Sequence, residues 1–482
     1  MLLELKGDGR QPHGRQIVAQ VRALIQEGHL KPGECLPSTR RLGDQLGLHR
    51  STVAGAYHEL WALGWLELRP GALPRVRRRG ALVPQAPPNA GAFPWADRLV
   101  LPQPPEPPAA LPEGTICFAN LGLDPRLMPL DPFARSLKAV LRRQGARLLD
   151  YGAPQGTASF RECLSHRMGQ HGVPVAPEEI LVTQGAQHAL DLALRGLTRP
   201  GDAILVELPT YDQMLKLLAL HQVRPLAIPA GADGLDLAAL EALVRHEQPT
   251  LLYTMPSFQN PTGRCLPQAQ REGLLALCER LALPILEDGF EEEMKYFGRP
   301  MLPLKSMDRS GLVLYAGTFS KVLFPGLRLG WLAGSRACID ALTAVRKAGD
   351  LCPPPLLQAA LEDFIQKGHL DQHLARLHRT FRRRMETCLA ALRRELDPRH
   401  VQWEPPTGGY LIWLGLTGFP EGLDLEQALL PFGLRVRKGS RFYPDAPPNQ
   451  LCLRLSISNL DEAEITEGIA RLGKGLRALI RA

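Results

Sequence analysis

A proline-rich stretch divides this 482-residue chain into two unequal parts and constrains how it can fold. Ten of the 29 residues from Pro84 to Pro112 are proline, and no apolar periodicity survives there. Proline fixes φ and lacks a backbone N–H group, so such a stretch favours a semi-extended linker over part of a hydrophobic core. The sequence therefore predicts a head of residues 1–80, a linker of residues 81–115 and a body of residues 116–482.

The net charge is concentrated in the head. The whole chain carries 57 Lys and Arg against 49 Asp and Glu, a net charge of +8. Residues 1–80 carry 13 Lys and Arg against 7 Asp and Glu, so the head contributes +6 and the other residues only +2. A basic excess confined to one short domain indicates that this domain meets a polyanion such as DNA.

Composition excludes several other classes of protein. With 45% apolar and 22% charged residues, the chain is typical of folded domains rather than disordered or collagen-like sequences. It has neither an apolar run of about 18 residues nor a secretory signal at Met1 to Arg10, so we expect a cytoplasmic protein without a membrane partner. Nine cysteines without a Cys-x-x-Cys pair favour reduced thiols, and no disulfide framework or metal site is expected.

Apolar spacing in the head predicts three helices and a short β-ribbon. Ile17 and Val21 recur at helical spacing, and after a turn Ser38 is placed to cap a short second helix. A third helix is expected from about Arg50 to Leu63, and residues 65–71 look like the beginning of a two-stranded ribbon. This order of elements is a winged helix-turn-helix.

The head resembles the DNA-binding domain of GntR-type regulators. The resemblance lies in LKPGECLPSTR (residues 30–40), GLHRSTV (47–53) and YHEL (57–60), although His49 stands where a capping serine is usual. It implies that the start of the third helix enters the major groove, with Arg50, Ser51 and Thr52 as base or phosphate contacts, while Arg40 and Arg41 contact the DNA backbone. The alternative is a solvated basic surface on a three-helix bundle.

The body alternates short apolar runs with helical patterns, which predicts an α/β fold. The clearest strands are residues 180–183, 203–206, 250–253, 284–287 and 312–315, with apolar helices between most of them. Such alternation is typical of a largely parallel sheet covered on both faces. Beyond about Asp340, a long helical region and strands near 410–414 and 451–456 predict a small α+β C-terminal subdomain.

Two loops of the body carry groups suited to phosphate binding and nucleophilic chemistry. Residues 185–187 lie between a strand and a helix, where free backbone amides can hold a phosphate. Thr318, Ser320, Lys321 and Arg328 follow another strand. The apolar run after Lys321 would partly desolvate its amine, which favours the neutral, nucleophilic form. Taken alone, Gly185 could simply form a tight turn, and a lone lysine is usually a solvated surface group.

Together with SFQNPTG (257–263) and LED (286–288), these loops resemble fold-type I pyridoxal-phosphate enzymes of the class I aminotransferase family, from about Ile116 to the C-terminus. The resemblance implies pyridoxal 5'-phosphate held covalently by Lys321, with Asp288 paired to the pyridine nitrogen. It further implies roles for a set of other residues: Asn260 on the phenolic oxygen, Tyr211 stacked on the ring, Gly185, Ala186, Gln187, Ser320 and Arg328 on the phosphate, Tyr151 reaching the phosphate from the second subunit, and Arg454 on a substrate or effector carboxylate. Phe290 stands where these folds usually carry a tyrosine that donates to the phenolic oxygen.

The order of GntR-type head, proline-rich linker and aminotransferase-like body identifies the chain as a member of the MocR subfamily of transcription regulators. The resemblance implies a homodimer that binds paired DNA half-sites. Pyridoxal phosphate, or an external aldimine formed with an amino-compound effector, would control that binding. Two alternatives stay open: a working aminotransferase with an accessory head, and a DNA-binding module whose body is only a dimerisation platform.

Overall fold

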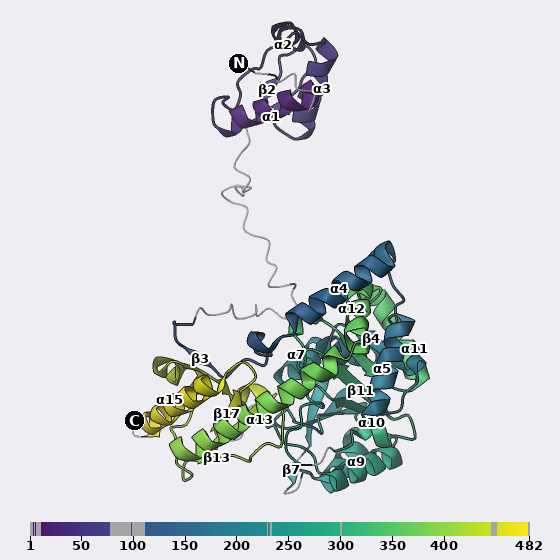
Figure 1. Ribbon diagram of the computed structural model, residues 1–482, viewed down its shortest axis with the longest axis vertical. Helices are drawn as coiled ribbons and strands as arrows, with labels where there is room; N and C mark the ends of the chain where they lie inside the picture. Colours follow the sequence, from purple (N-terminus) through teal and green to yellow (C-terminus); the bar gives the residue numbers. More distant parts are fainter. Residues whose placement is uncertain are drawn as a thin grey trace. The chain divides into compact units, whose positions relative to one another are not determined.

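The computed structural model describes Leu3, Leu5, Arg98 and residues 11–77, 111–228, 230–231, 234–298, 301–444 and 451–480. The chain divides into two compact units, Met1–Pro102 and Gln103–Ala482 (Figure 1). Most of the stretch from Pro84 to Pro112, and with it most of the predicted linker, lies outside the described residues. Each unit has a hydrophobic core of its own.

The head is a three-helix bundle with a two-stranded ribbon. Its elements are α1 (His13–Gln26), α2 (Thr39–Leu46), α3 (Arg50–Ala62) and the antiparallel strands β1 (Leu66–Glu67) and β2 (Arg75–Val76). The core buries residues from all three helices, among them Ile17, Val21, Leu42, Val53, Tyr57 and Leu60. The Tyr57 hydroxyl also donates to the carbonyl of Pro37 at 3.0 Å, which ties α3 to the turn before α2. The predicted winged helix-turn-helix is confirmed.

Side-chain caps determine where α2 and α3 begin. The Ser38 hydroxyl accepts from the amide of Arg41 at 3.2 Å, as the sequence predicts. At α3 the capping atom is Nδ1 of His49, which accepts from the amide of Ser51 at 3.3 Å. An imidazole nitrogen thus replaces the usual serine oxygen, and α3 still begins at Arg50.

The body is built on a seven-stranded sheet with the strand order β4-β12-β11-β10-β9-β5-β6. The strands are β4 (Ile180–Thr183), β5 (Ala203–Glu207), β6 (Arg224–Ile228), β9 (Leu251–Thr254), β10 (Ile285–Asp288), β11 (Val313–Thr318) and β12 (Gly330–Ala333). The five predicted strands are present, but β6 and β12 were missed. β6 is an edge strand with Pro225 at its second position, and β12 opens on a glycine. Because β12 is antiparallel to both of its neighbours, the sheet is mixed rather than wholly parallel.

Helices cover both faces of this sheet because successive strand residues point to opposite sides. On β10, Leu286 packs into a cluster with α6 (Ala186–Leu197), α7 (Asp212–Leu220) and α11 (Arg336–Asp350). The preceding residue, Ile285, packs into a different cluster with α8 (Leu237–Glu247), α9 (Gln268–Leu281) and α10 (Leu304–Met307). The sheet is therefore buried on both sides, as the apolar runs predict.

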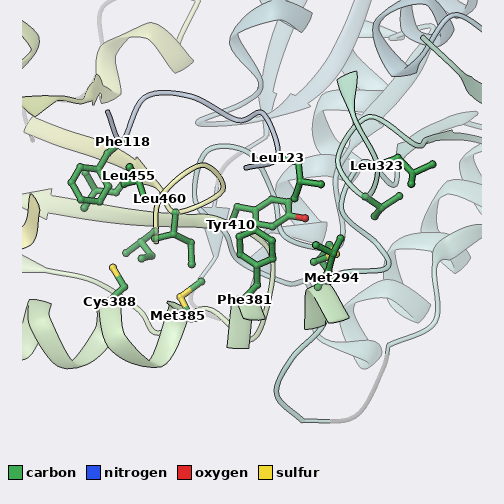
Figure 2. Close-up of a cluster of buried hydrophobic side chains, with 14 of the residues drawn as sticks. Phe118, Leu123, Met294, Leu323, Phe381, Met385, Cys388, Tyr410, Leu455 and Leu460 are labelled. Carbon is green, nitrogen blue, oxygen red and sulfur yellow. The ribbon is translucent and has the colours of Figure 1, made fainter. Parts of the chain in front are cut away.

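A second sheet forms the C-terminal subdomain. Its antiparallel strands are β13 (Val401–Gln402), β14 (Leu411–Leu416), β17 (Leu451–Ser456) and β16 (Arg437–Lys438), in that spatial order. Figure 2 shows part of its core, in which Met385 and Cys388 of α13 (His369–Glu395) lie near Leu455 and Leu460. The helix α15 (Glu462–Ile480) packs along α13 and completes the predicted α+β subdomain.

The remaining described strands and α-helices lie outside these two sheets. They are β3 (Ile116–Cys117), which pairs in parallel with β15 (Leu434–Arg435), the hairpin β7 (Ala230–Gly231) and β8 (Gly234–Leu235), and the helices α4 (Leu130–Gln144), α5 (Ala158–Gln170), α12 (Pro355–Gln366) and α14 (Leu425–Ala428). Within the described ranges, no helix is long and apolar enough to cross a membrane.

Leu60→Ala should destabilise the head by about 2–5 kcal/mol, because Leu60 is fully buried in the head's core. In calorimetry of the full chain, the unfolding transition of the head should move to lower temperature while that of the body stays in place. Leu63→Ala is the matched control, since Leu63 is 49% exposed. Equal shifts for the two variants would contradict the described packing of α3.

Candidate functional site

Six strands of the large sheet end at the same edge, and the loops after five of them line one cavity. β5, β9, β10 and β11 are parallel, and the antiparallel β12 between β11 and β4 makes β4 parallel to them too. The loops after their carboxyl ends therefore meet, which is where open α/β sheets place ligand sites. A cavity there is lined by residues from all five loops, including the predicted Ala186, Gln187, Tyr211, Asn260, Asp288, Ser320, Lys321 and Arg328.

Asp288 ends β10 with one carboxylate oxygen bonded and the other free. Oδ2 accepts from the Tyr253 hydroxyl at 3.0 Å, whereas Oδ1 is buried without a hydrogen-bond partner among the described residues. Burial raises the pKa of Asp288 to about 6, against the lowering effect of Tyr253. A buried carboxylate oxygen without a partner needs a donor from a ligand, and a protonated ring nitrogen is such a donor.

Lys321 follows β11 and reaches across the cavity. Its Nζ donates to the carbonyl of Leu121 at 3.2 Å, and its own backbone carbonyl accepts from the Tyr410 hydroxyl at 2.7 Å. Burial lowers the pKa of Lys321, although the carboxylate of Glu291 acts in the opposite direction. Desolvation therefore favours the neutral amine, the form that attacks a carbonyl group.

Glu291 is an acid near Lys321 that the sequence analysis missed. It is fully buried, Oε2 accepts from the amide of Tyr410 at 3.1 Å, and Oε1 has no partner in the described part of the chain. Burial raises the pKa of Glu291 to about 8, while the charge of Lys321 lowers it. Either member of this pair can hold the proton. In the sequence, Glu291 begins a run of three glutamates, which is typical of a solvated surface.

The predicted phosphate-binding groups gather at the start of α6. Gly185 precedes the helix with φ 86°, and no side chain caps its first amides. Arg328 donates to the carbonyl of Gln184 at 2.6 Å, and a Cβ on Gly185 would lie 3.3 Å from its guanidinium. The Ser320 hydroxyl accepts from Thr318 at 3.1 Å. Free amides, a hydroxyl and a guanidinium at a helix N-terminus fit a phosphate group.

Arg454 on β17 is buried and bound to Asn260. It donates from Nη1 to Oδ1 of Asn260 at 3.2 Å and from Nη2 to the carbonyl of Ala119 at 2.7 Å. Burial lowers the pKa of Arg454 to about 10. Since the oxygen of Asn260 accepts from Arg454, its amide nitrogen remains to donate to a ligand. On the cavity wall, the Tyr211 hydroxyl donates to Gln187 at 3.2 Å, and Phe290 brings no hydroxyl.

Three predicted site residues of the body, Gly185, Arg454 and Tyr151, are not among those that line this cavity, and Tyr151 is the exposed one. Its side chain is 79% exposed, and Leu149 and Leu351 are exposed as well. The amide of Gly152 donates to Sγ of Cys352 at 3.3 Å, which places the loops of Tyr151 and Leu351 side by side. Large exposed apolar side chains on adjacent loops are typical of a surface that another chain covers.

The predicted DNA-binding residues lie at the beginnings of α2 and α3. Arg40, Arg41, Arg50 and Ser51 are exposed, and within the described residues none of the three arginines forms an ion pair. Nε of Arg50 donates to the hydroxyl of Thr39 at 3.3 Å, which joins the two helix starts. Thr52 is half-buried near Gly14 of α1, so it is less accessible than the other four.

Known proteins resemble both parts of the chain. Residues 13–76 match the bacterial regulatory proteins of the gntR family, and residues 124–472 match the aminotransferase class I and II family. The probable rhizopine catabolism regulatory protein MocR of Rhizobium meliloti is 32% identical over 99% of this chain and 96% of its own length. The HTH-type transcriptional regulator TauR of Rhodobacter capsulatus is 32% identical over 98% and 97% of the two chains. The chain belongs to the MocR subfamily of GntR-type regulators.

The body of this MocR-type chain has a fold-type I aminotransferase structure. LysN, the α-aminoadipate aminotransferase of Thermus thermophilus, solved with N-(5'-phosphopyridoxyl)-L-leucine, superposes with a TM-score of 0.71 at 32% identity. That match covers 77% of this chain and 94% of LysN. The cofactor of the family is pyridoxal 5'-phosphate, and the unpartnered Oδ1 of Asp288 and the uncapped start of α6 fit its ring nitrogen and its phosphate. No cluster of metal-ligating side chains occurs in the described residues.

Glu291→Gln should lower the pKa of Lys321 further, because it removes a carboxylate that favours the ammonium form. Capture of pyridoxal phosphate by the apoprotein needs the neutral amine. The pH–rate profile of capture, followed by absorbance, should therefore shift to lower pH. Glu178→Gln, at an exposed position, is the control. A profile identical to that of the unmodified protein would show that Glu291 does not act on Lys321.

Proposed function

We propose that this protein is a pyridoxal-phosphate-dependent transcription regulator, in which an amino compound that reacts with the cofactor changes how the two heads of a homodimer contact DNA. Pyridoxal phosphate supplies an aldehyde that condenses with primary amines. Lys321 carries the cofactor and Asp288 pairs with its ring nitrogen. Further residues position it: Asn260 on the phenolic oxygen, Tyr211 on the ring face, and Gly185, Ala186, Gln187, Ser320 and Arg328 on the phosphate.

The observation that supports coupling between this site and the rest of the chain is a set of hydrogen bonds to three consecutive backbone carbonyls. The carbonyl of Ala119 accepts from Arg454 at 2.7 Å, that of Asn120 from Ser458 at 3.2 Å, and that of Leu121 from Lys321 at 3.2 Å. In the proposed function, Lys321 binds the cofactor and Arg454 binds the effector carboxylate. Ligands therefore compete with this segment for two of its three donors.

Residues 119–121 lie where a change in their hydrogen bonds can act on the start of the body. They follow β3, which is the first strand of the body after the predicted linker. The neighbouring Phe118 is buried and bonded on both sides, to the carbonyl of Arg435 at 2.8 Å and to the amide of Ser456 at 2.8 Å. Loss of the donors would release residues 119–121 and act through Phe118 on β3, the strand that follows the linker. We infer that site occupancy reaches the linker, and through it the head, by this segment.

A homodimer completes the proposed site. Tyr151 does not line the cavity of its own chain and is exposed, as are Leu149 and Leu351. A second copy covering that surface would bring Tyr151 to the phosphate of the neighbouring site. Two heads per dimer would then contact paired half-sites, whose spacing reflects the symmetry of the protein.

Arg40→Ala and Arg41→Ala should weaken binding to every DNA sequence and reduce the salt dependence of log K by about one unit for each phosphate that the variant no longer neutralises. Arg50→Ala, at the start of α3, should also relax sequence preference. Fluorescence anisotropy at several salt concentrations measures both effects on operator and unrelated duplexes. Arg336→Ala, at a body position with a 72% exposed side chain, is the control. Unchanged binding in all three head variants would favour the solvated-surface interpretation.

Effector affinity should change when operator DNA is present, because coupling between two binding sites is reciprocal. We expect a difference of about 5- to 150-fold for the compound that controls transcription, measured by titrating candidate amines against the cofactor absorbance. Footprinting of the region upstream of the protein's own gene supplies the operator. Lys321→Ala should abolish both the absorbance band and the adduct that borohydride traps.

The same titration separates regulator from enzyme. Equal dissociation constants with and without operator would mean that the body does not signal to the head through binding. Rapid amino-group transfer to an oxo acid in that case would favour the aminotransferase alternative, which the retained Lys321, Asp288 and Arg454 permit. Absence of any cofactor band in the unmodified protein would favour a body that serves only as a dimerisation platform.

A further inference from the structure

A second cavity, of about 430 Å³, lies in the body next to the cofactor cavity. Its walls come from α5, the loop after β10 and the strands β11 and β12. Phe290 and Thr318 line both cavities, whereas Lys321 lines only the first. The volume is within the range of about 300–1,000 Å³ that small-molecule sites have. Nothing in the proposed function makes use of this cavity.

Four aromatic side chains line the second cavity: Phe258, Phe290, Tyr315 and Trp331. Gly289 makes room for one of them, since a Cβ at that position would lie only 2.1 Å from the Tyr315 hydroxyl oxygen. Aromatic faces attract cations, and they attract them more strongly where water is excluded. The aromatic wall therefore suits a ligand with a positive charge and an apolar part.

The cationic groups of the wall already have partners. Arg167 contacts Glu293 at 2.6 Å and Asp371 at 3.1 Å, so two carboxylates neutralise one guanidinium. Lys295 donates to the hydroxyl of Thr407 at 3.2 Å. Arg167 is therefore neutralised, whereas Lys295 forms no ion pair among the described residues, and its charge lowers the pKa of Glu292.

Glu292 differs from Glu293, the other acid of the wall, which pairs with Arg167. In the described part of the chain it forms no ion pair, and its carboxylate accepts from the Ser257 hydroxyl. Ser257 in turn accepts from the buried Arg271 at 2.8 Å. Arg271 also faces Glu287, whose carboxylate is held by two backbone amides at 2.8 Å. Among the described residues Arg271 forms an ion pair with neither carboxylate; its charge lowers the pKa of both, whereas burial raises it.

We propose that this second cavity binds a small alkyl amine as its ammonium ion, with the charge on Glu292 and the alkyl group against the aromatic walls. The amine binds without a covalent bond, because no cofactor aldehyde lies in this cavity. The site does not depend on the head or on DNA. Through the shared wall at Phe290 and Thr318, an occupant lies directly beside the cofactor cavity.

Calorimetric titration of the full-length holoprotein after borohydride reduction tests this proposal. Reduction fixes the cofactor on Lys321, so an added amine cannot react with it and any binding reports a different site. The probes are n-butylamine at pH 7.5 and its neutral counterpart, n-butanol. We expect the amine to bind at least about tenfold more tightly than the alcohol, because only the ammonium forms a charge-assisted hydrogen bond.

Variants locate the binding. Glu292→Gln keeps the shape of the wall and should reduce amine affinity by about tenfold or more, with little effect on the alcohol. Leu302 lines the same cavity and is 47% exposed, so changes there leave the core intact. Leu302→Lys should weaken amine binding and Leu302→Glu should strengthen it. Glu178→Gln should have no effect.

Two results would overturn the proposal. One is equal affinity for butylamine and butanol; the other is amine binding that none of the Glu292 and Leu302 variants alters. Neither result bears on the role of Lys321 or on DNA binding, since the cofactor is already fixed and no DNA is present. A failure here is therefore distinguishable from a failure of the proposed regulatory function.

Discussion

The common direction of five strands brings together most groups of the candidate cofactor site, and β17 of the C-terminal subdomain adds Arg454. Each of β4, β5, β9, β10 and β11 ends at one sheet edge, and residues from the end of the strand or from the loop after it line the same cavity. The antiparallel strand β12 fits between β11 and β4 because glycines allow close packing there. A Cβ on Gly330 would lie 2.6 Å from the carbonyl of Gly317 and 2.9 Å from the Cα of Gly185. The same contacts thus join the sheet to the turn that begins α6.

Burial of charge distinguishes this edge from the rest of the molecule. Asp288, Glu291 and Arg454 each keep one polar atom without a partner among the described residues, although all three side chains are buried. Unsatisfied buried groups cost free energy, and they persist where the structure around them is held by other interactions. Here the two covered faces of the sheet and the core of the C-terminal subdomain supply that stability. Ligand binding then satisfies groups that the ligand-free fold leaves incomplete.

The sequence predicted what depends on local pattern, and it missed what depends on distant contacts. The head, the strands β4, β5, β9, β10 and β11 and the loop residues that line the cavity carry their own signals in apolar spacing, caps and motifs. Strand β12 carries none, because a short run that opens on glycine reads as a turn until its neighbours are known. Glu291 was missed for a similar reason. Its neighbour Glu293 pairs with Arg167, which lies more than a hundred residues earlier in the chain, so burial of this acidic run depends on tertiary contacts.

The three carbonyls of residues 119–121 also have a thermodynamic consequence. In the proposed function they compete with the ligand for Lys321 and Arg454, so the free energy of these contacts is subtracted from the intrinsic affinity of the site. The hydrogen bond from Ser458 to Asn120 helps to hold this segment in place, although neither residue is proposed to contact the ligand. The effector concentration at which such a regulator responds is therefore set partly by residues that never touch the effector. Related chains could adjust their sensitivity there while the cofactor chemistry stays the same.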